Sequence, residues 1–182
     1  GHDAWLYNAD YLNEGTYNKL KGLFDGFADY TQYFKNENHD IWEEVVQRII
    51  DFEPEWVGYT SYTANVTTIN IISKKLRKLS PHIKQVIGGV HATLDQNVIK
   101  RLKAIDYSVQ REGEMAMLSL VNCVDPKTIS GVVSRNGPSI CNNGDANVNM
   151  DIDSLPLPER DKFWGISESD KKTIDVSYIC SI

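Results

Sequence analysis

The sequence has 182 residues, of which 41% are hydrophobic and 24% charged, the length and composition of one ordinary globular domain with its own core. Nineteen lysines and arginines against 25 aspartates and glutamates give a net charge of −6, which argues against general binding of nucleic acid. Three scattered cysteines lack the spacing of a zinc site or a disulfide framework, so a reduced, cytoplasmic setting is expected. No apolar run reaches the ~20 residues that a membrane span needs.

The first part of the chain predicts a strand, an excursion and a helix. Residues 4–8 are aromatic and apolar and predict a short buried strand. Residues 11–38 have weak helical spacing and predict a partly helical excursion. Apolar residues then recur every four positions in 40–51, which predicts a helix with Asp40 as its N-cap.

Three strand–loop–helix repeats follow with short loops. The predicted strands are 56–59, 83–87 and 105–109, and the predicted helices are 65–79, 95–103 and 112–121. This alternation is typical of the α/β class. The sequence therefore predicts an open, doubly wound parallel sheet, Rossmann-like or flavodoxin-like, with helices on both faces.

The rhythm changes after residue 124. Two short β stretches, 129–134 and 139–141, flank a turn and predict a β extension. Residues 153–158 contain two prolines and predict an extended linker. After it, 159–164 predicts one helical turn and 174–180 a strand that begins a further domain. We therefore expect an α/β domain in 1–124, a β extension in 125–150, and in 151–182 a linker with the first strand of another domain.

Three loops at the carboxyl ends of the predicted strands form the candidate binding site, because ligands of open parallel sheets bind at this edge. The first loop offers hydroxyl groups, the second has two glycines that let a ligand approach the backbone, and the third is a charged turn at a helix start. Each loop alone also fits an ordinary structural role: a cap, a tight turn or a solvated helix start. The candidate residues are Thr60, Ser61, Tyr62, Thr63, Gly88, Gly89, Val90, His91, Glu112, Gly113 and Glu114.

Other kinds of site lack their parts. Neither GxGxxG nor GxxxxGK[ST] occurs, so the phosphate-binding loops of dinucleotide and nucleoside triphosphate sites are missing. The four histidines lack metal-ligand spacing, and His91 alone follows a strand at the candidate edge. The sequence shows neither a Ser/His/Asp nor a Cys/His arrangement, so we expect no catalytic residue and no metal ligand in the candidate site.

Five stretches of the sequence, in the same order, resemble one family. They match its second strand, its third strand, its VxGGxHAT turn, its DYxVxGEGE stretch and its LPxPxR linker. The stretches are 3–10, 57–61, 85–93, 105–114 and 153–160. The chain thus resembles the amino-terminal cobalamin-binding domain of B12-dependent radical S-adenosylmethionine enzymes.

This resemblance implies roles for the three loops. Ser61 and the Gly88-Gly89 pair would hold the nucleotide tail of cobalamin, with the Ser61 hydroxyl bonded to a dimethylbenzimidazole nitrogen. Glu112, Gly113 and Glu114 would close the same crevice, and a leucine in place of Gly89 would fill it. The parent protein would carry a 4Fe-4S cluster and S-adenosylmethionine in a barrel absent from this sequence, and methyl transfer would be its usual reaction. The first strand of the domain would precede residue 1.

Three departures from the family pattern bear on these roles. Arg111 stands where the pattern has a glycine, so the backbone of that turn is expected to differ. The DxHxxG motif that supplies a cobalt ligand in other cobalamin proteins would lie before residue 1, so no protein ligand to cobalt is assigned. Cys180 has the position of a cluster ligand, but Tyr178-Ile179 replaces the usual Arg-Gly before it, and the two indications balance.

Two alternatives remain open. A flavodoxin-like or receiver-like regulatory module would share the fold, although a receiver would place clustered acidic residues where this chain has serine and paired glycines. A docking domain that has lost cobalamin binding would share both fold and sequence pattern.

Overall fold

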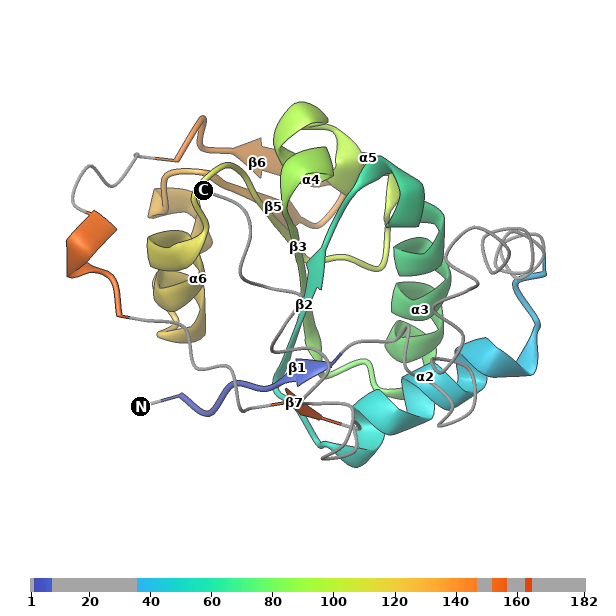
Figure 1. The fold of residues 1–182 in the computed structure, drawn as a ribbon. Coiled ribbons are helices and arrows are strands. Elements are labelled where there is room, and N and C mark those ends of the chain that lie inside the picture. Colours follow the sequence, from blue (N-terminus) through green and yellow to red (C-terminus); the bar gives the residue numbers. More distant parts are fainter. Residues whose placement is uncertain (1, 8–35, 147–151, 157–162, 165–182) are drawn as a thin grey trace. The chain divides into compact units, whose positions relative to one another are not determined.

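The computed structural model describes residues 2–7, 36–146, 152–156 and 163–164, which fall into two compact units. The larger unit contains 36–146 and the smaller one the remaining described residues (Figure 1). The predictions for 11–35 and 174–180 lie outside the described residues.

The smaller unit holds one parallel strand pair. β1 (Leu6–Tyr7) pairs with β7 (Phe163–Trp164), with Leu6 opposite Phe163. Three predictions are corrected here. The first strand is not buried, since Leu6 is 51% exposed, and residues 163–164 are a strand instead of part of a helical turn. A short 3-10 turn, Ile152–Ser154, also opens the linker that was expected to be extended.

The larger unit is built on a five-stranded sheet whose strands follow each other in chain order. The first three strands are parallel, and the last two form a hairpin that joins the sheet antiparallel to the third. The predicted α/β fold is therefore confirmed, and the β extension is part of the same sheet. The strands are β2 (Trp56–Thr60), β3 (Lys84–Gly88), β4 (Tyr107–Val109), β5 (Val132–Asn136) and β6 (Ser139–Asn142).

Helices cover both faces of this sheet because consecutive strand residues point to opposite sides. Ile87 belongs to a core cluster with residues of α3 (Val66–Leu79), α4 (Val90–Leu94) and α5 (Val98–Arg101). Its neighbour Val86 belongs to a second cluster with Ala116 and Leu120 of α6 (Glu114–Val121). Figure 1 shows α3 and α6 on opposite sides of the strands.

Helix starts differ from prediction at two places. α2 (Asp40–Asp51) has the predicted bounds, but its N-cap is His39, whose ring nitrogen accepts the N–H of Ile41, and not Asp40. Of the helix predicted over 95–103 only residues 98–101 are helical, as α5, and a further short helix that was not predicted, α4, follows Gly89 directly. α4 begins this early because Ser61, in the loop after β2, accepts hydrogen bonds from two N–H groups at its start.

Candidate functional site

Ser61 and the Gly88-Gly89 turn are joined by hydrogen bonds. Both the backbone N–H and the hydroxyl of Ser61 donate to the carbonyl oxygen of Gly88, at 2.8 and 2.6 Å. The Ser61 hydroxyl also accepts the N–H of Ala92, and the Ser61 carbonyl accepts the N–H of His91. Ser61 thereby satisfies two N–H groups that the start of α4 would otherwise leave unpaired.

The Ser61 hydroxyl takes part in this cap through both of its hydrogen bonds. The residue is completely buried, and its one hydroxyl proton is directed at Gly88. The bond to a dimethylbenzimidazole nitrogen that the family resemblance implied would need that same proton. In this structure the hydrogen bonds of Ser61 stabilise the Gly88-Gly89 turn and the start of α4.

Gly89 is held in a conformation that favours glycine. Its φ is +90°, and a Cβ at this position would lie 3.0 Å from both the nitrogen and the oxygen of Ser61. The glycine thus permits the sharp bend from β3 into α4 and the close approach of the Ser61 backbone.

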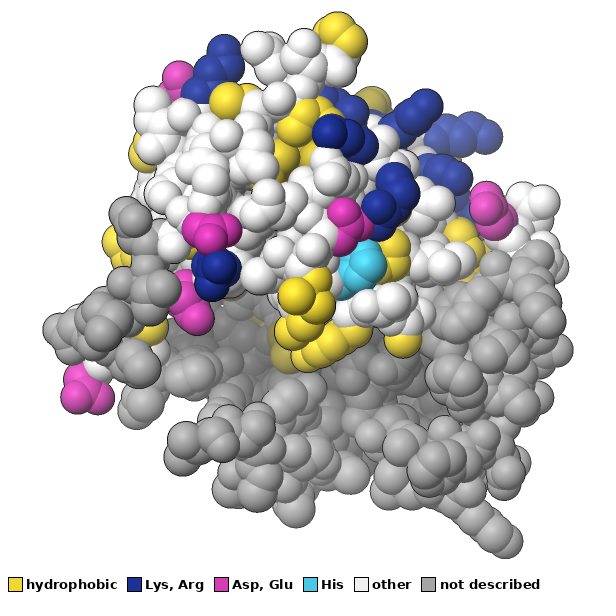
Figure 2. All heavy atoms as spheres, turned by 90° about the horizontal axis from the view of Figure 1, so that it is seen from above, with side chains coloured by type: hydrophobic (Ala, Val, Ile, Leu, Met, Phe, Trp, Pro, Cys, Tyr) yellow, Lys and Arg dark blue, Asp and Glu magenta, His cyan; other side chains and the backbone are white. Residues whose placement is uncertain are grey.

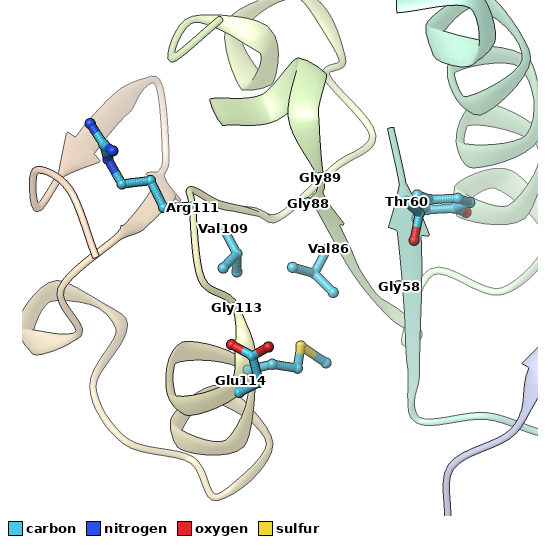
Figure 3. A pocket seen from close by; sticks show the side chains of 11 residues that line it. Gly58, Thr60, Val86, Gly88, Gly89, Val109, Arg111, Gly113 and Glu114 are labelled. Atoms are coloured by element: carbon cyan, nitrogen blue, oxygen red, sulfur yellow. The ribbon is translucent and has the colours of Figure 1, made fainter. Parts of the chain in front are cut away.

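A cavity of about 410 Å³ opens beside this turn, on the face of the sheet that carries α6 (Figure 3). Gly58 and Thr60 of β2 and Val86 and Gly88 of β3 form its floor, because residues two apart share a face. The β4–α6 turn and the first part of α6 form a wall. The remaining lining residues are Tyr59, Gly89, Val109, Arg111, Gly113, Glu114 and Met117. The volume lies within the ordinary range of small-molecule sites.

The structure divides the predicted site residues into two groups. Thr60, Gly88, Gly89, Gly113 and Glu114 line the cavity. The other six do not line it: Ser61, Tyr62, Thr63, Val90, His91 and Glu112.

His91 takes part in a separate polar cluster on α4. Its Nδ1 lies 3.1 Å from the Thr63 hydroxyl, and its Nε2 lies 3.8 Å from the carboxylate of Asp95. Asp95 also binds Arg101. Burial raises the pKa of the Asp95 carboxyl group, but the hydrogen bonds from Arg101 and from the Asn97 N–H, together with the nearby positive charge, outweigh it and lower the pKa overall. These contacts fix the position of the His91 imidazole between Thr63 and Asp95.

Exposed hydrophobic side chains accompany these charges at the carboxyl edge of the sheet. Tyr62, Val90 and Leu94 are 57%, 56% and 79% exposed. Figure 2 looks onto the molecule from this side and shows hydrophobic, acidic and basic side chains next to one another.

Arg111 has a φ of +58°, in the left-handed region that favours glycine, at the position where the family pattern has a glycine. The Arg111 side chain forms an ion pair with Asp145 at 2.8 Å, and this hydrogen bond raises the pKa of the guanidinium. The backbone N–H of Arg111 donates to the Thr93 hydroxyl at 2.8 Å.

Several lining residues were missed at the sequence level although a signal existed. Strand alternation places Gly58 and Val86 on the same face as Thr60 and Gly88. A glycine inside a strand also marks a close approach of a ligand or another backbone. Met117, in contrast, could not be placed without knowing which face of the sheet α6 covers.

Residues 25–121 match the family model of the B12 binding domain, which is more than half of the chain. This chain belongs to the B12-binding domain family. The resemblance to a cobalamin-binding domain drawn from the sequence is thus confirmed. Because the match ends at residue 121, it includes the strands and helices that form the cavity.

Two relatives carry the same printed name, anaerobic magnesium-protoporphyrin IX monomethyl ester cyclase. The protein from Rubrivivax gelatinosus is 30% identical over 179 residues, covering 92% of this chain and 29% of the relative. The protein from Cereibacter sphaeroides is 24% identical over 149 residues, covering 78% of this chain and 24% of the relative. This chain therefore spans less than a third of the length of either relative.

Two features of other kinds of function are absent from the described residues. None of their helices has both the length and the apolar character needed to cross a membrane. Nor does any group of three His, Cys, Asp or Glu side chains among them have the arrangement of a metal site. Cys180, the candidate cluster ligand, lies outside the described residues.

Proposed function

We propose that this domain binds cobalamin and holds its nucleotide tail in the cavity between β2, β3 and α6. The proposal rests on the absence of side chains at Gly58 and Gly88, two neighbouring positions in the cavity floor. A Cβ on Gly58 would make only an ordinary contact, 3.8 Å from Val86 Cγ1, and one on Gly88 would lie 3.7 Å from the Val109 oxygen. Neither glycine has a positive φ.

The fold itself therefore does not require glycine at these two places. Glycine inside a strand costs stability relative to a residue with a side chain, so its presence at two neighbouring floor positions needs another reason. A ligand that occupies the space of the absent side chains is such a reason. The cavity thus fits a buried appendage such as the cobalamin tail.

The walls fit the chemistry of that tail. Val86, Val109 and Met117 offer apolar and polarizable surface for an aromatic base, and Thr60 and Glu114 offer oxygens to the hydroxyl groups of a ribose. Bound cobalamin would supply a cobalt centre that carries a methyl group or exchanges electrons. The residues of this domain would bind and orient it, and Ser61 would support the turn beneath it.

We propose further that the whole protein is a cobalamin-dependent radical S-adenosylmethionine enzyme, with a 4Fe-4S cluster in a barrel outside this sequence. Methyl transfer is the usual reaction implied by the family resemblance. The printed name of both relatives is instead that of a cyclase, which favours a ring-forming reaction for the parent protein.

The test is retention of hydroxocobalamin by the full-length protein, read from the visible spectrum after desalting. Gly58→Val should fill the floor without backbone strain and abolish retention. Val57→Ile is the matched control, because it enlarges the same strand on the opposite face and should retain the pigment.

Cobinamide, which lacks the nucleotide tail, separates the cavity from the rest of the site. Gly58→Val should weaken hydroxocobalamin binding and leave cobinamide binding unchanged. A colourless wild-type protein would overturn the proposal in favour of a flavodoxin-like, receiver-like or docking module. A Gly58→Val protein that retains hydroxocobalamin would place the tail elsewhere.

A further inference from the structure

The two loops that border the cavity are linked by one side chain that does not itself line it. Thr93 lies in α4, and its hydroxyl donates to the carbonyl oxygen of Gly89 at 3.1 Å. The same hydroxyl accepts the backbone N–H of Arg111 at 2.8 Å. Thr93 thus connects the glycine turn at the cavity floor to the β4–α6 turn in its wall.

The turn that Thr93 holds is strained in this chain. Arg111 has a φ of +58°, a conformation that costs an L-residue with a side chain and that glycine adopts freely. The Arg111 side chain is half exposed and forms an ion pair with Asp145, and it points away from Val86 and Gly88 in the cavity floor (Figure 3). The hydrogen bond to Thr93 therefore fixes the backbone at the point where it is least stable by itself.

The position of this turn decides the shape of the cavity wall. Val109 precedes Arg111, and Gly113 and Glu114 follow it, and all of them line the cavity. If Arg111 relaxed to a negative φ, the direction of the chain would change between Val109 and α6, and the wall would move relative to the floor.

We propose that Thr93 is a positioning residue for the cobalamin tail, which keeps the Arg111 turn in its left-handed conformation and so sets the distance between the Gly89 turn and the α6 wall. The proposal rests on the proposed function of the cavity. It also explains how the chain holds a left-handed backbone conformation at Arg111, a residue other than glycine.

The first test compares Thr93→Val and Thr93→Ser in the full-length protein. Valine keeps the shape and removes both hydrogen bonds, so the dissociation constant of hydroxocobalamin should rise about three- to tenfold. Serine keeps the hydroxyl and should restore binding. Thr128→Val is the matched control, since the Thr128 hydroxyl makes a similar bond to Asp125 O, neither residue lines the cavity, and its loss should leave binding unchanged.

A double-mutant cycle shows whether Thr93 acts through the turn. Arg111→Gly removes the strain, so Thr93→Val should weaken binding less in the Arg111→Gly background than in the wild type. An equal loss in both backgrounds would overturn the proposal, as would unchanged binding in Thr93→Val.

Amide hydrogen exchange gives a readout that needs no cobalamin. The Arg111 amide should be protected in the wild type and in Thr93→Ser, and should exchange faster in Thr93→Val. Equal exchange in all three proteins would overturn the proposal. A wild-type protein that binds no hydroxocobalamin would instead overturn the function of the cavity, so the two failures are distinguishable.

Discussion

A Cβ atom on Gly89 would lie 3.0 Å from both the backbone nitrogen and the backbone oxygen of Ser61. This contact shows that the two loops implied by the family resemblance are neighbours at one edge of the sheet. It also shows that a side chain on Gly89 would meet Ser61 first, so Gly89→Leu tests the fold and not only the crevice that leucine was expected to fill.

Gly89→Ala should therefore destabilise the domain. The positive φ and the contact with Ser61 together should lower the free energy of unfolding by about 2 kcal/mol, measured by urea denaturation. Gly88→Ala is the matched control on the preceding residue, because its Cβ would have room and its φ is ordinary. Equal stability of the two variants would contradict the strain assigned to Gly89.

Ser61→Ala should weaken the fold more than it weakens binding. The variant leaves the buried N–H of Ala92 without its acceptor, which should cost about 1–2 kcal/mol in the free energy of unfolding. Ser119→Ala provides the comparison, because the Ser119 hydroxyl makes an exposed bond to Met115 O and its removal should cost less than about 0.5 kcal/mol.

Hydroxocobalamin titration of folded Ser61→Ala separates the two roles of this serine. A cap behind the turn predicts a change in the dissociation constant of less than about threefold. A loss of tenfold or more, with stability unchanged, would instead show that the hydroxyl contacts the ligand.

The sequence was sufficient to predict the α/β architecture because the signals for it are local. Strand and helix periods alternate three times between residues 56 and 121, and the observed β2, β3, β4, α3 and α6 lie within two residues of the predicted bounds. The start of α4 was missed because its cap comes from Ser61, some thirty residues earlier in the chain. No local pattern contains that contact.

The candidate site was predictable only in part, for a related reason. The resemblance indicated the correct edge and loops, but the pattern of residues does not say whether the Ser61 hydroxyl faces a ligand or the backbone of Gly88. The role of Thr93 depends on its contact with Arg111, which lies 18 residues further along the chain. Such roles follow from side-chain directions, which only the packed structure fixes.

Tyr59 should make the stability of the domain fall at alkaline pH. Its hydroxyl donates to the buried Gln85 Oε1 at 2.7 Å, and burial raises its pKa well above the ordinary value of 10.0. The unfolded chain loses this proton at lower pH than the native protein, so the native state binds more protons above pH 10. This contribution to stability is complete below pH 10 and is lost as pH rises further.

The check is urea denaturation of the wild type and Tyr59→Phe between pH 8 and pH 11. The variant should be less stable at pH 8, because Gln85 Oε1 loses its donor, and its stability should decline less steeply above pH 10. Tyr62→Phe changes an exposed tyrosine and should follow the wild type at every pH. Identical slopes for wild type and Tyr59→Phe would contradict the assignment.

Arg77 should stabilise the amino-terminal edge of the sheet without affecting the cavity. Its guanidinium donates to Pro81 O at 2.7 Å, to Ile83 O at 3.2 Å and to Ala104 O at 3.0 Å, and binds the Asp106 carboxylate at 2.5 Å. One side chain thus joins the end of α3 to the starts of β3 and β4. A lysine cannot reproduce this fork, so Arg77→Lys should lower the free energy of unfolding by about 2 kcal/mol.

Arg101→Lys is the control for this substitution, because the Arg101 side chain is 56% exposed and pairs with Asp95 at the surface, so its replacement should cost less than about 0.5 kcal/mol. Hydroxocobalamin affinity of folded Arg77→Lys should equal that of the wild type, since the cavity lies toward the carboxyl ends of the same strands. A parallel loss of affinity would show that the two edges of the sheet are coupled and that stability, not cavity shape, governs binding. Unchanged stability would show that the four contacts of Arg77 are dispensable.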